Sequence, residues 1–414
     1  MDREILVYAD WLAPSPVLIG TLYSSSSKGK DVFSFEYSPL WLEEHSGVFL
    51  DPDLYPFRGR QFLPSGKEIF GLFSDSSPDR WGRVLMKRRE SDNAKRENRE
   101  RRRLTALDFL LGVDDASRMG GLRFRDRSDG PFLSDSRNPV PVWTSLRELE
   151  SASLALEGDD GTESEIEEYL ELLLVPGSSL GGARPKASVV APDSSLWMAK
   201  FPSRSDERDT GAWEMVCHTL ASLCGLDVVD AKCEKFSRSG STFLTRRFDR
   251  NGGNRIHFMS ALTALGRTDG SSVSDGSSYL DIAEVIRMYS TRPGKDLEEL
   301  WKRIVFSICV TNTDDHLRNH GFLISGDSFV LSPLYDVNPS EYGGALSLNI
   351  DEDSNALDLD TAIDAARYYG LEKDEAASLS KSIAETVSSH WRRLASLYGI
   401  SRTETAEMER CFIS

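Results

Sequence analysis

Short apolar runs rich in strand-forming residues open the N-terminal part of the chain. They are Ile5–Tyr8 and Val17–Tyr23, which a Pro/Ser turn at Pro14–Pro16 separates, and Phe33–Tyr37 then alternates between apolar and polar residues as a half-buried strand does. Residues of this type with turn signals between them are typical of short strands. The pattern therefore predicts two strands followed by a third.

Helical spacing follows these strands. Ser74–Met86 offers a capping Ser or Asp and then a helical pattern that continues into a basic stretch, and Leu104–Leu111 is a second helical segment. Gly120–Arg125 predicts one more strand, so this first part is α+β. Asp126–Pro141 is rich in Asp, Ser, Gly and Pro, which favours a connecting segment.

The rest of the chain changes from strand-like to helical patterns. An acidic stretch, Glu157–Glu171, predicts the exposed face of a helix that ends at Pro176. A small sheet with one helix is expected next, with strands at Ala187–Ala191, Leu196–Lys200, near Val228 and at Thr242–Thr245, and a helix at Ala212–Cys224. From Leu280 onward helical periodicity dominates, except at Phe322–Ile324 and Phe329–Leu331.

This order predicts an α+β, two-lobed arrangement. We expect an N-terminal subdomain at 1–125, the rest of a small N-terminal lobe at 142–248, and a mainly helical C-terminal lobe at 249–414. A length of 414 residues agrees with more than one packed unit.

Composition limits the class of protein and the cellular compartment that we expect. Hydrophobic residues at 39% and charged residues at 28% are ordinary for a globular protein, and no apolar run is long enough to cross a membrane. The charged N-terminus lacks the apolar core of a signal peptide, so we expect a cytoplasmic protein. Five scattered cysteines favour reduced thiols over disulfides or zinc. A net charge of -17 disfavours general attraction to nucleic acid.

The basic stretch runs from Arg83 to Arg103 and is densest between Lys87 and Arg103. Acidic residues interrupt it, and two acid–base pairs stand at helical spacing, Asp92 with Arg96 and Glu97 with Arg101. The mixed signs favour a solvated helix face. A surface for nucleic acid or a partner is the alternative, and the sequence leaves the role of this stretch open.

Three polar residues carry the strongest chemical signal. Asp314 and Asn319 have the spacing of the catalytic Asp and metal-binding Asn of protein kinases, and Asp336 follows the two short apolar pieces as a second metal-binding carboxylate would. A hairpin between those pieces would bring the three together. Oxygen ligands from Asn319 and Asp336 suit magnesium. Asp314 and Asn319 alone are also compatible with a capped turn.

A glycine- and serine-rich segment, Gly177–Lys186, precedes the first strand of the small sheet and suits backbone contacts with phosphate. It lacks the Walker A pattern, and an ordinary loop is the alternative. Lys200 ends the next strand, where it could contact nucleotide phosphates while Glu214 fixes its position. For this pair the alternative is a surface salt bridge.

Together these segments resemble the successive motifs of HipA-type serine/threonine kinases, toxins of bacterial toxin–antitoxin pairs. The motifs, in chain order, are Gly177–Lys186, Lys200–Pro202, Arg247–Arg250, Asn312–Asn319 and Leu331–Asp336, and the N-terminal part adds Leu63–Pro64 and Pro78–Gly82. The resemblance covers nearly the whole chain. It implies a fold distantly similar to protein kinases, with ATP and Mg²⁺ as cofactors.

The resemblance also assigns roles to residues. Asp314 would orient the target hydroxyl, with Lys200 as a second catalytic residue, and Asn319 and Asp336 would hold magnesium. The nucleotide-binding set would comprise Ser179, Gly181, Gly182, Ala183, Lys186, Lys200, Glu214, Arg246, Phe248, Asp249, His316, Asn319 and Asp336. Within it, Lys186 would reach the phosphates or brace the loop, Phe248 would lie near adenine and Asp249 would serve the ribose. We expect a structural hydrogen bond from His316.

Self-inactivation is a further implication of the resemblance. Ser179, with Ser178 beside it, occupies the position that such kinases phosphorylate on themselves. Phosphate adds nearly two negative charges, which would repel ATP from the loop. The alternative is that both serines only satisfy turn geometry.

The function implied is a protein kinase toxin that phosphorylates a translation component such as an aminoacyl-tRNA synthetase. A DNA-binding HipB-like antitoxin would be its partner, with DNA contacted only through that antitoxin and no membrane involved. Two alternatives stay open: a small-molecule or lipid kinase of the same fold, and an inactive scaffold that binds a transcription regulator.

Overall fold

The computed structural model describes residues 3–27, 30–134, 140–174, 184–326 and 328–413. Its contacts divide the chain into two compact units. Unit 1 comprises Met1–Arg204, Arg247–Met259 and Ile324–Asp327. Unit 2 comprises Ser205–Arg246, Ser260–Leu323 and Ser328–Ser414. Each unit is described by itself.

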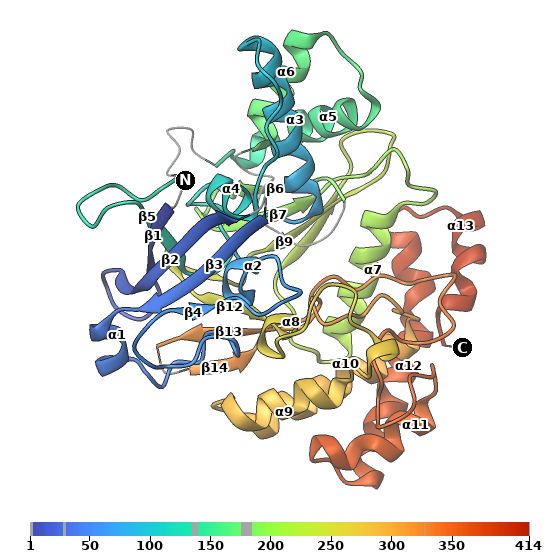
Figure 1. Cartoon of the computed structure of the whole chain (residues 1–414). Helices are drawn as coiled ribbons and strands as arrows, with labels where there is room; N and C mark the ends of the chain where they lie inside the picture. The colour runs from blue at the N-terminus through green and yellow to red at the C-terminus, as the bar shows by residue number, and fades with distance from the viewer. Residues whose placement is uncertain (1–2, 28–29, 135–139, 175–183, 327, 414) are drawn as a thin grey trace. The chain divides into compact units, whose positions relative to one another are not determined.

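An antiparallel sheet, ordered β4-β3-β2-β1-β5, forms the N-terminal part of unit 1, and β1 to β3 lie side by side in Figure 1. Its strands are β1 (Arg3–Ala9), β2 (Val17–Ser27), β3 (Lys30–Tyr37), β4 (Gln61–Phe62) and β5 (Leu122–Arg125). Alternate residues such as Val7, Leu22 and Phe35 are fully buried, which is the period of a sheet with one covered face. The predicted strands in this region are confirmed.

Helices cover this sheet and extend unit 1. They are α1 (Pro39–Glu44), α2 (Gly71–Ser74), α3 (Arg80–Arg96), α4 (Ala106–Gly112), η1 (Trp143–Ser145), α5 (Leu146–Gly158) and α6 (Glu163–Leu174). The acidic stretch predicted as one helix is divided between α5 and α6, because Asp159 takes a left-handed conformation with φ 51° and ends α5. Helix α5 is tied to α3, where Arg88 donates a 2.7 Å hydrogen bond to the Leu156 carbonyl.

The basic stretch is partly neutralised within unit 1. Glu90, on α3, accepts hydrogen bonds from Arg99 and from the Arg102 backbone, at 2.6 and 3.0 Å. The expected pair of Asp92 with Arg96 is present at 3.7 Å. The expected helical pair of Glu97 with Arg101 is wrong, because the helix ends at Arg96.

The remaining strands of unit 1 are a hairpin and short pieces after it. The hairpin pairs β6 (Lys186–Val190) with β7 (Leu196–Lys200). The short pieces are β10 (Arg250–Asn251), β11 (Asn254–Arg255) and β12 (His257–Ser260), the last residue of which belongs to unit 2.

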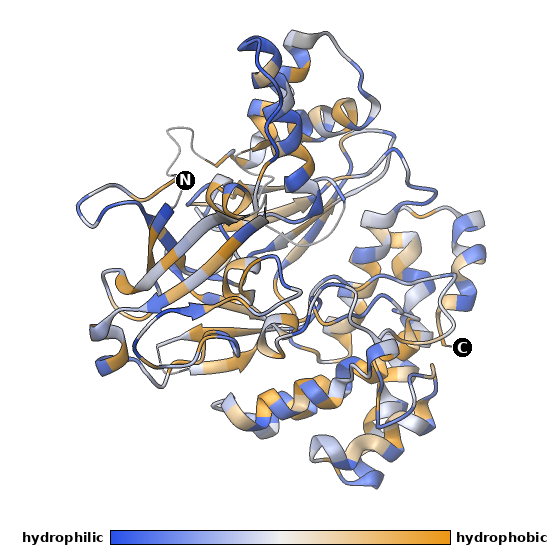
Figure 2. Ribbon diagram, in the orientation of Figure 1, coloured by the Kyte–Doolittle hydropathy of each residue, from blue (hydrophilic) through white to orange (hydrophobic). Residues whose placement is uncertain are grey.

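Unit 2 is mainly helical, as predicted. Its helices are α7 (Thr210–Leu223), α8 (Ala261–Ala264), η2 (Val273–Asp275), α9 (Tyr279–Tyr289), α10 (Pro293–Cys309), α11 (Leu359–Ala365), η3 (Ala366–Tyr369), α12 (Lys373–Leu397), α13 (Arg402–Glu407) and η4 (Met408–Cys411). Hydrophobic and hydrophilic residues intermix along α9 and α12 in Figure 2, as expected for helices that bury one side.

The strands of unit 2 differ from the prediction in one place. They are β8 (Ala231–Glu234), β9 (Thr242–Arg246), β13 (Gly321–Ser325, whose last two residues belong to unit 1) and β14 (Ser328–Leu331). The strand expected near Val228 begins three residues later, at Ala231. Between Leu331 and Asp358 the chain has neither helix nor strand, although helical periodicity was expected there.

The compact units are divided differently from the predicted segments 1–125, 142–248 and 249–414. The predicted connecting segment, Asp126–Pro141, does not separate two compact units. Its last residue is bonded to β6, where the Val190 N–H donates a 2.8 Å hydrogen bond to the Pro141 carbonyl. No helix among the described residues is long and apolar enough to span a membrane.

Aromatic stacking fixes the C-terminal end of unit 2. Phe412 stacks on Trp391 of α12 with ring centroids 4.6 Å apart, and it lies 5.7 Å from Trp213 of α7. Trp213 and Trp391 are 1% exposed, and Phe412 is 5% exposed. The last turn of the chain is therefore part of the core.

Phe412→Ala should lower the free energy of unfolding by about 3–5 kcal/mol, because it leaves a cavity between two buried indole rings. Leu397→Ala on the exposed end of α12 is the matched control and should change it by less than about 0.5 kcal/mol. Chemical denaturation followed by tryptophan fluorescence measures both. Equal effects of the two variants would contradict the packing assigned to Phe412.

Candidate active site

The segment Asp314–Asn319 follows α10 and is shaped by its own backbone. Thr311 turns the chain in a left-handed conformation with φ 51°. The His316 N–H then donates to the Asp314 carbonyl at 3.0 Å, and the Asn319 N–H donates to the His316 carbonyl at 2.8 Å. The Asn319 side chain donates its Nδ2 to the Asp314 carbonyl at 2.9 Å. Because the side-chain nitrogen of Asn319 donates this hydrogen bond, its side-chain oxygen is the atom that can coordinate a cation.

Helix α10 holds the chain that leads to Asp336. Asp296 accepts a hydrogen bond from the Leu331 N–H at 2.9 Å, and Arg303 donates to the Ser332 carbonyl at 2.7 Å. Asp336 itself has φ 58°, a conformation that costs a non-glycine residue energy and is often found at functional sites.

The geometry brings Asp314 and Asp336 within electrostatic reach of each other. Burial raises the pKa of Asp314; His316 opposes that rise, and the Asp336 carboxylate adds to it. Two carboxylates that repel each other form a site where a divalent cation would reduce the repulsion. The sequence placed Asp314, His316, Asn319 and Asp336 in one site, and all four lie in unit 2.

The donor set fits magnesium. Asn319 and Asp336 offer hard oxygen atoms, and magnesium usually takes one or two protein ligands together with phosphate oxygens and water. Among the described residues no group of three His, Cys, Asp or Glu side chains forms a complete metal site. A site completed by nucleotide phosphates is consistent with both observations.

A buried network next to this site was missed in the sequence. The Asp315 carboxylate is 3.0 Å from Nε2 of His320, and it accepts a 2.7 Å hydrogen bond from the hydroxyl of Tyr279 on α9. Asp315 and His320 each follow a predicted site residue in the chain, Asp314 and Asn319. The five-residue spacing of Asp315 and His320, equal to that of Asp314 and Asn319, was the available signal, but nothing in the sequence showed that both side chains are buried.

Lys186 and Lys200 lie opposite each other in the β6–β7 hairpin of unit 1. Lys186 forms a buried ion pair, with Nζ 2.8 Å from Oδ2 of Asp79 and with both side chains less than 5% exposed. The other oxygen of Asp79 accepts the Gly82 N–H at 2.7 Å and caps α3. Lys186 therefore braces the start of β6 on α3.

The predicted pairing of Lys200 with Glu214 and the predicted phosphate-binding loop are not tested by the fold. Lys200 is 7% exposed at the end of β7, and Glu214 is 4% exposed on α7. They belong to different units, so their pairing stays a prediction. Ser178, Ser179, Gly181, Gly182 and Ala183 lie outside the described residues.

The predicted adenine and ribose residues have structural partners. Arg246 pairs with Asp230 at 3.4 Å, and the Phe248 ring lies 5.8 Å from that of Phe258. Asp249 is fully buried.

The oxygens of Asp249 are occupied. Arg247 donates to both, at 2.8 and 2.5 Å, and Oδ2 also accepts from Arg250 at 2.6 Å and from the Gly120 N–H at 2.8 Å. Burial alone would raise the pKa of Asp249, but Arg247 and Arg250 lower it to about 2. These contacts favour a structural role for Asp249 over contact with a ribose.

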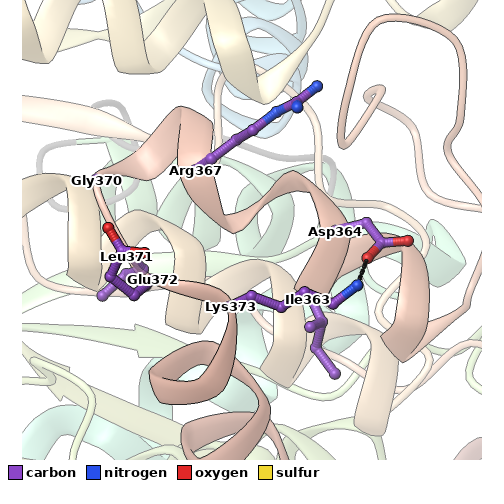
Figure 3. A pocket seen from close by; sticks show the side chains of 7 residues that line it. All are labelled: Ile363, Asp364, Arg367, Gly370, Leu371, Glu372 and Lys373. Carbon is purple, nitrogen blue, oxygen red and sulfur yellow. Dashed lines mark hydrogen bonds and ion pairs between the residues drawn. The ribbon is translucent and has the colours of Figure 1, made fainter.

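A surface pocket of about 510 Å³ lies elsewhere in unit 2, between η3 and the start of α12 (Figure 3). Its charged residues include Asp364 and Lys373, which pair with each other at 2.6 Å. None of the predicted site residues lines this pocket.

Comparisons with known proteins agree on one family. The family model described as "HipA-like C-terminal domain" matches residues 178–391. The curated protein "Putative kinase Y4mE" of Sinorhizobium fredii (strain NBRC 101917 / NGR234) is 29% identical over 182 residues, which cover 38% of this chain and 41% of Y4mE. The chain thus matches less than half the length of this relative.

A solved structure matches nearly the whole chain. It is the complex of the toxin–antitoxin proteins HipA and HipB with operator DNA from Shewanella oneidensis MR-1. The match has a TM-score of 0.68 and 17% identity, and it covers 98% of this chain and 94% of the other. This confirms the predicted two-lobed, kinase-like α+β fold.

Asp249→Asn should lower the free energy of unfolding by about 3–5 kcal/mol, because it leaves two buried guanidinium groups without their counter-charge. Asp230→Asn, which removes the partner of the exposed Arg246, is the matched control and should cost at most about 1 kcal/mol. Urea denaturation at neutral pH measures both variants.

The same carboxylate predicts a pH dependence. Because its folded pKa of about 2 lies below its ordinary value of 3.8, its stabilisation is complete above that ordinary value and is lost as pH falls toward 2. The wild type should therefore lose more stability than Asp249→Asn between pH 4 and pH 2. Parallel curves for the two proteins would contradict the charge assigned to Asp249.

Proposed function

The chain belongs to the family of proteins with a HipA-like C-terminal domain, and on that premise we propose that it is an ATP- and magnesium-dependent protein serine/threonine kinase. One observation carries the proposal: the Asn319 side chain donates to the Asp314 carbonyl, and the Asp336 carboxylate, from a separate segment, contributes to the raised pKa of Asp314. Phosphoryl transfer requires a carboxylate that orients the acceptor and oxygen ligands for magnesium.

Each residue has a distinct task in this proposal. Asp314 accepts a hydrogen bond from the hydroxyl of the acceptor and orients its oxygen toward the γ-phosphate of ATP. Asn319 and Asp336 hold magnesium, which when bound neutralises charge on the phosphates. Lys200, at the end of β7, contacts the nucleotide phosphates.

The biological setting follows the relatives. We propose that the chain is the toxin of a type II toxin–antitoxin pair, that it phosphorylates a translation component such as an aminoacyl-tRNA synthetase, and that a DNA-binding HipB-like protein neutralises it. The fold likeness to a HipA chain from a complex with HipB and DNA supports this partner. DNA would be contacted through the antitoxin, in keeping with a net charge of -17.

Self-phosphorylation at Ser179 completes the proposal. A phosphate there would place nearly two negative charges in a segment that precedes Lys186 and Lys200 in the chain. Lys186 is paired with Asp79, so Lys200, opposite it in the hairpin, is the lysine that we propose for contact with nucleotide phosphates.

Asp314→Asn should lower phosphate transfer by about 100-fold or more, because the amide cannot accept the hydroxyl proton. Phosphoproteomics of cells that express the wild type and the variant side by side measures this and identifies the targets. Asp364→Asn changes an exposed aspartate of the same unit and should retain activity. Protein phosphorylation that persists in Asp314→Asn would contradict the catalytic assignment, and label found only in small molecules would favour a small-molecule kinase.

The purified wild type incubated with ATP and magnesium should acquire one phosphate on the peptide that contains residues 177–186. Mass spectrometry with fragmentation distinguishes Ser178 from Ser179. Ser179→Ala should lose the modification and retain phosphorylation of other proteins for longer. A peptide that stays unmodified while other proteins are phosphorylated would remove the self-inactivation proposal alone.

A further inference from the structure

The proposed site requires that two side chains at opposite ends of one loop stay in register. Asp314 and Asn319 are five positions apart, and the hydrogen bonds between them, through the His316 backbone and from the Asn319 side chain, all end on the Asp314 main chain and leave its carboxylate unheld. Asp314 is exposed, and neighbouring residues bury only part of its side chain. A misplacement of about 1 Å in such a site can cost a hundredfold in rate, so the loop needs a further constraint.

The buried contact between Asp315 and His320 supplies that constraint. Their side chains are 3% and 0% exposed, and Oδ1 of Asp315 lies 3.0 Å from Nε2 of His320. Each directly follows one of the two residues that must stay in register. The pair therefore joins the two ends of the loop on its buried side, while the Asp314 side chain faces solvent.

We propose that Asp315 and His320 are positioning residues that hold Asp314 and Asn319 in their catalytic arrangement. This inference rests on the kinase function proposed above. Neither residue touches ATP, metal or acceptor in this assignment, because both side chains are buried.

The surroundings of the pair are consistent with a charged carboxylate. Burial alone would raise the pKa of Asp315, but His320 and the Tyr279 hydroxyl outweigh that effect and lower it. The Oδ2 atom of Asp315 accepts from Tyr279 at 2.7 Å and from Ser307 at 3.4 Å. These two contacts anchor Asp315 to α9 and α10 without crossing the loop.

Tyr279 provides the matched control. Tyr279→Phe removes a hydrogen bond to the same carboxylate, so it weakens the buried network, but it leaves the link across the loop intact. His320→Leu removes the link and keeps Tyr279. If the network serves stability alone, the two variants should affect activity in proportion to their loss of melting temperature.

The experiment uses the full chain with radiolabelled ATP, magnesium and a cell lysate as the source of acceptors. His320→Leu should lower the transfer rate at saturating ATP by about tenfold while KM for ATP changes by less than about threefold, the pattern of a lost transition-state arrangement. Tyr279→Phe should retain the rate within about twofold. His320→Gln, whose amide can still donate to Asp315, should recover much of the rate.

A second measurement does not depend on activity. Manganese replaces magnesium as the probe, and its affinity is measured by electron paramagnetic resonance in the presence of a non-hydrolysable ATP analogue. His320→Leu and Asp315→Asn should weaken manganese binding, because Asn319 is displaced, whereas Tyr279→Phe should not. Asp315→Asn keeps the size of the side chain, so it tests the pair if His320→Leu does not fold.

The outcomes separate the two proposals. A wild type that transfers no phosphate to the lysate would contradict the kinase function, and the manganese measurement would still decide the role of the pair. An active wild type in which His320→Leu and Tyr279→Phe lose rate and manganese affinity equally would overturn the positioning role. Loss confined to variants that break the link would support it.

Discussion

The candidate site depends on the confinement of two carboxylates that repel each other. Asp314 and Asp336 come from separate segments, and their proximity contributes to the raised pKa of Asp314. Such an arrangement persists only if the surrounding fold supplies the energy to hold it. Helix α10 does so on one side, because Asp296 and Arg303 fix the backbone that leads to Asp336. A cation between the carboxylates would reduce the repulsion, which agrees with the magnesium site that we propose.

Buried ion pairs recur at each point where this chain fixes a segment. Asp79 with Lys186, Asp249 with Arg247, and Asp315 with His320 are all nearly inaccessible to solvent. Desolvation makes such pairs poor sources of stability compared with apolar side chains of the same size. Directional contacts such as the two hydrogen bonds from Arg247 to Asp249, however, fix the orientation of a backbone segment more sharply than apolar packing does. We therefore attribute them to positioning, and the strands that they fix are those that precede or follow predicted site residues.

The sequence predicts structural features that depend on local patterns, but it does not reveal contacts between residues that are far apart in the chain. Runs of strand-forming residues located the strands of the N-terminal sheet, and residue types at kinase-like spacing singled out Asp314, Asn319 and Asp336 as candidates. The environment of Asp249 could not be predicted, because one of its hydrogen-bond donors is Gly120, 129 residues away. The network of Asp315 was missed for the same reason, since Tyr279 is 36 residues away on another helix. Helical periodicity also overestimated the helix content after Asp336, where tertiary contacts outweigh propensity.

The two roles that the sequence left open for Lys186 can be weighed by the cost of moving it. If Lys186 left Asp79 to reach phosphates, a buried carboxylate would lose its counter-charge, and breaking such a pair costs about 3–5 kcal/mol. Burial already raises the pKa of Asp79, against the influence of Lys186. Bracing is thus the favoured role of Lys186, and of the two lysines it is Lys200, opposite in the hairpin, for which we propose the contact with nucleotide phosphates.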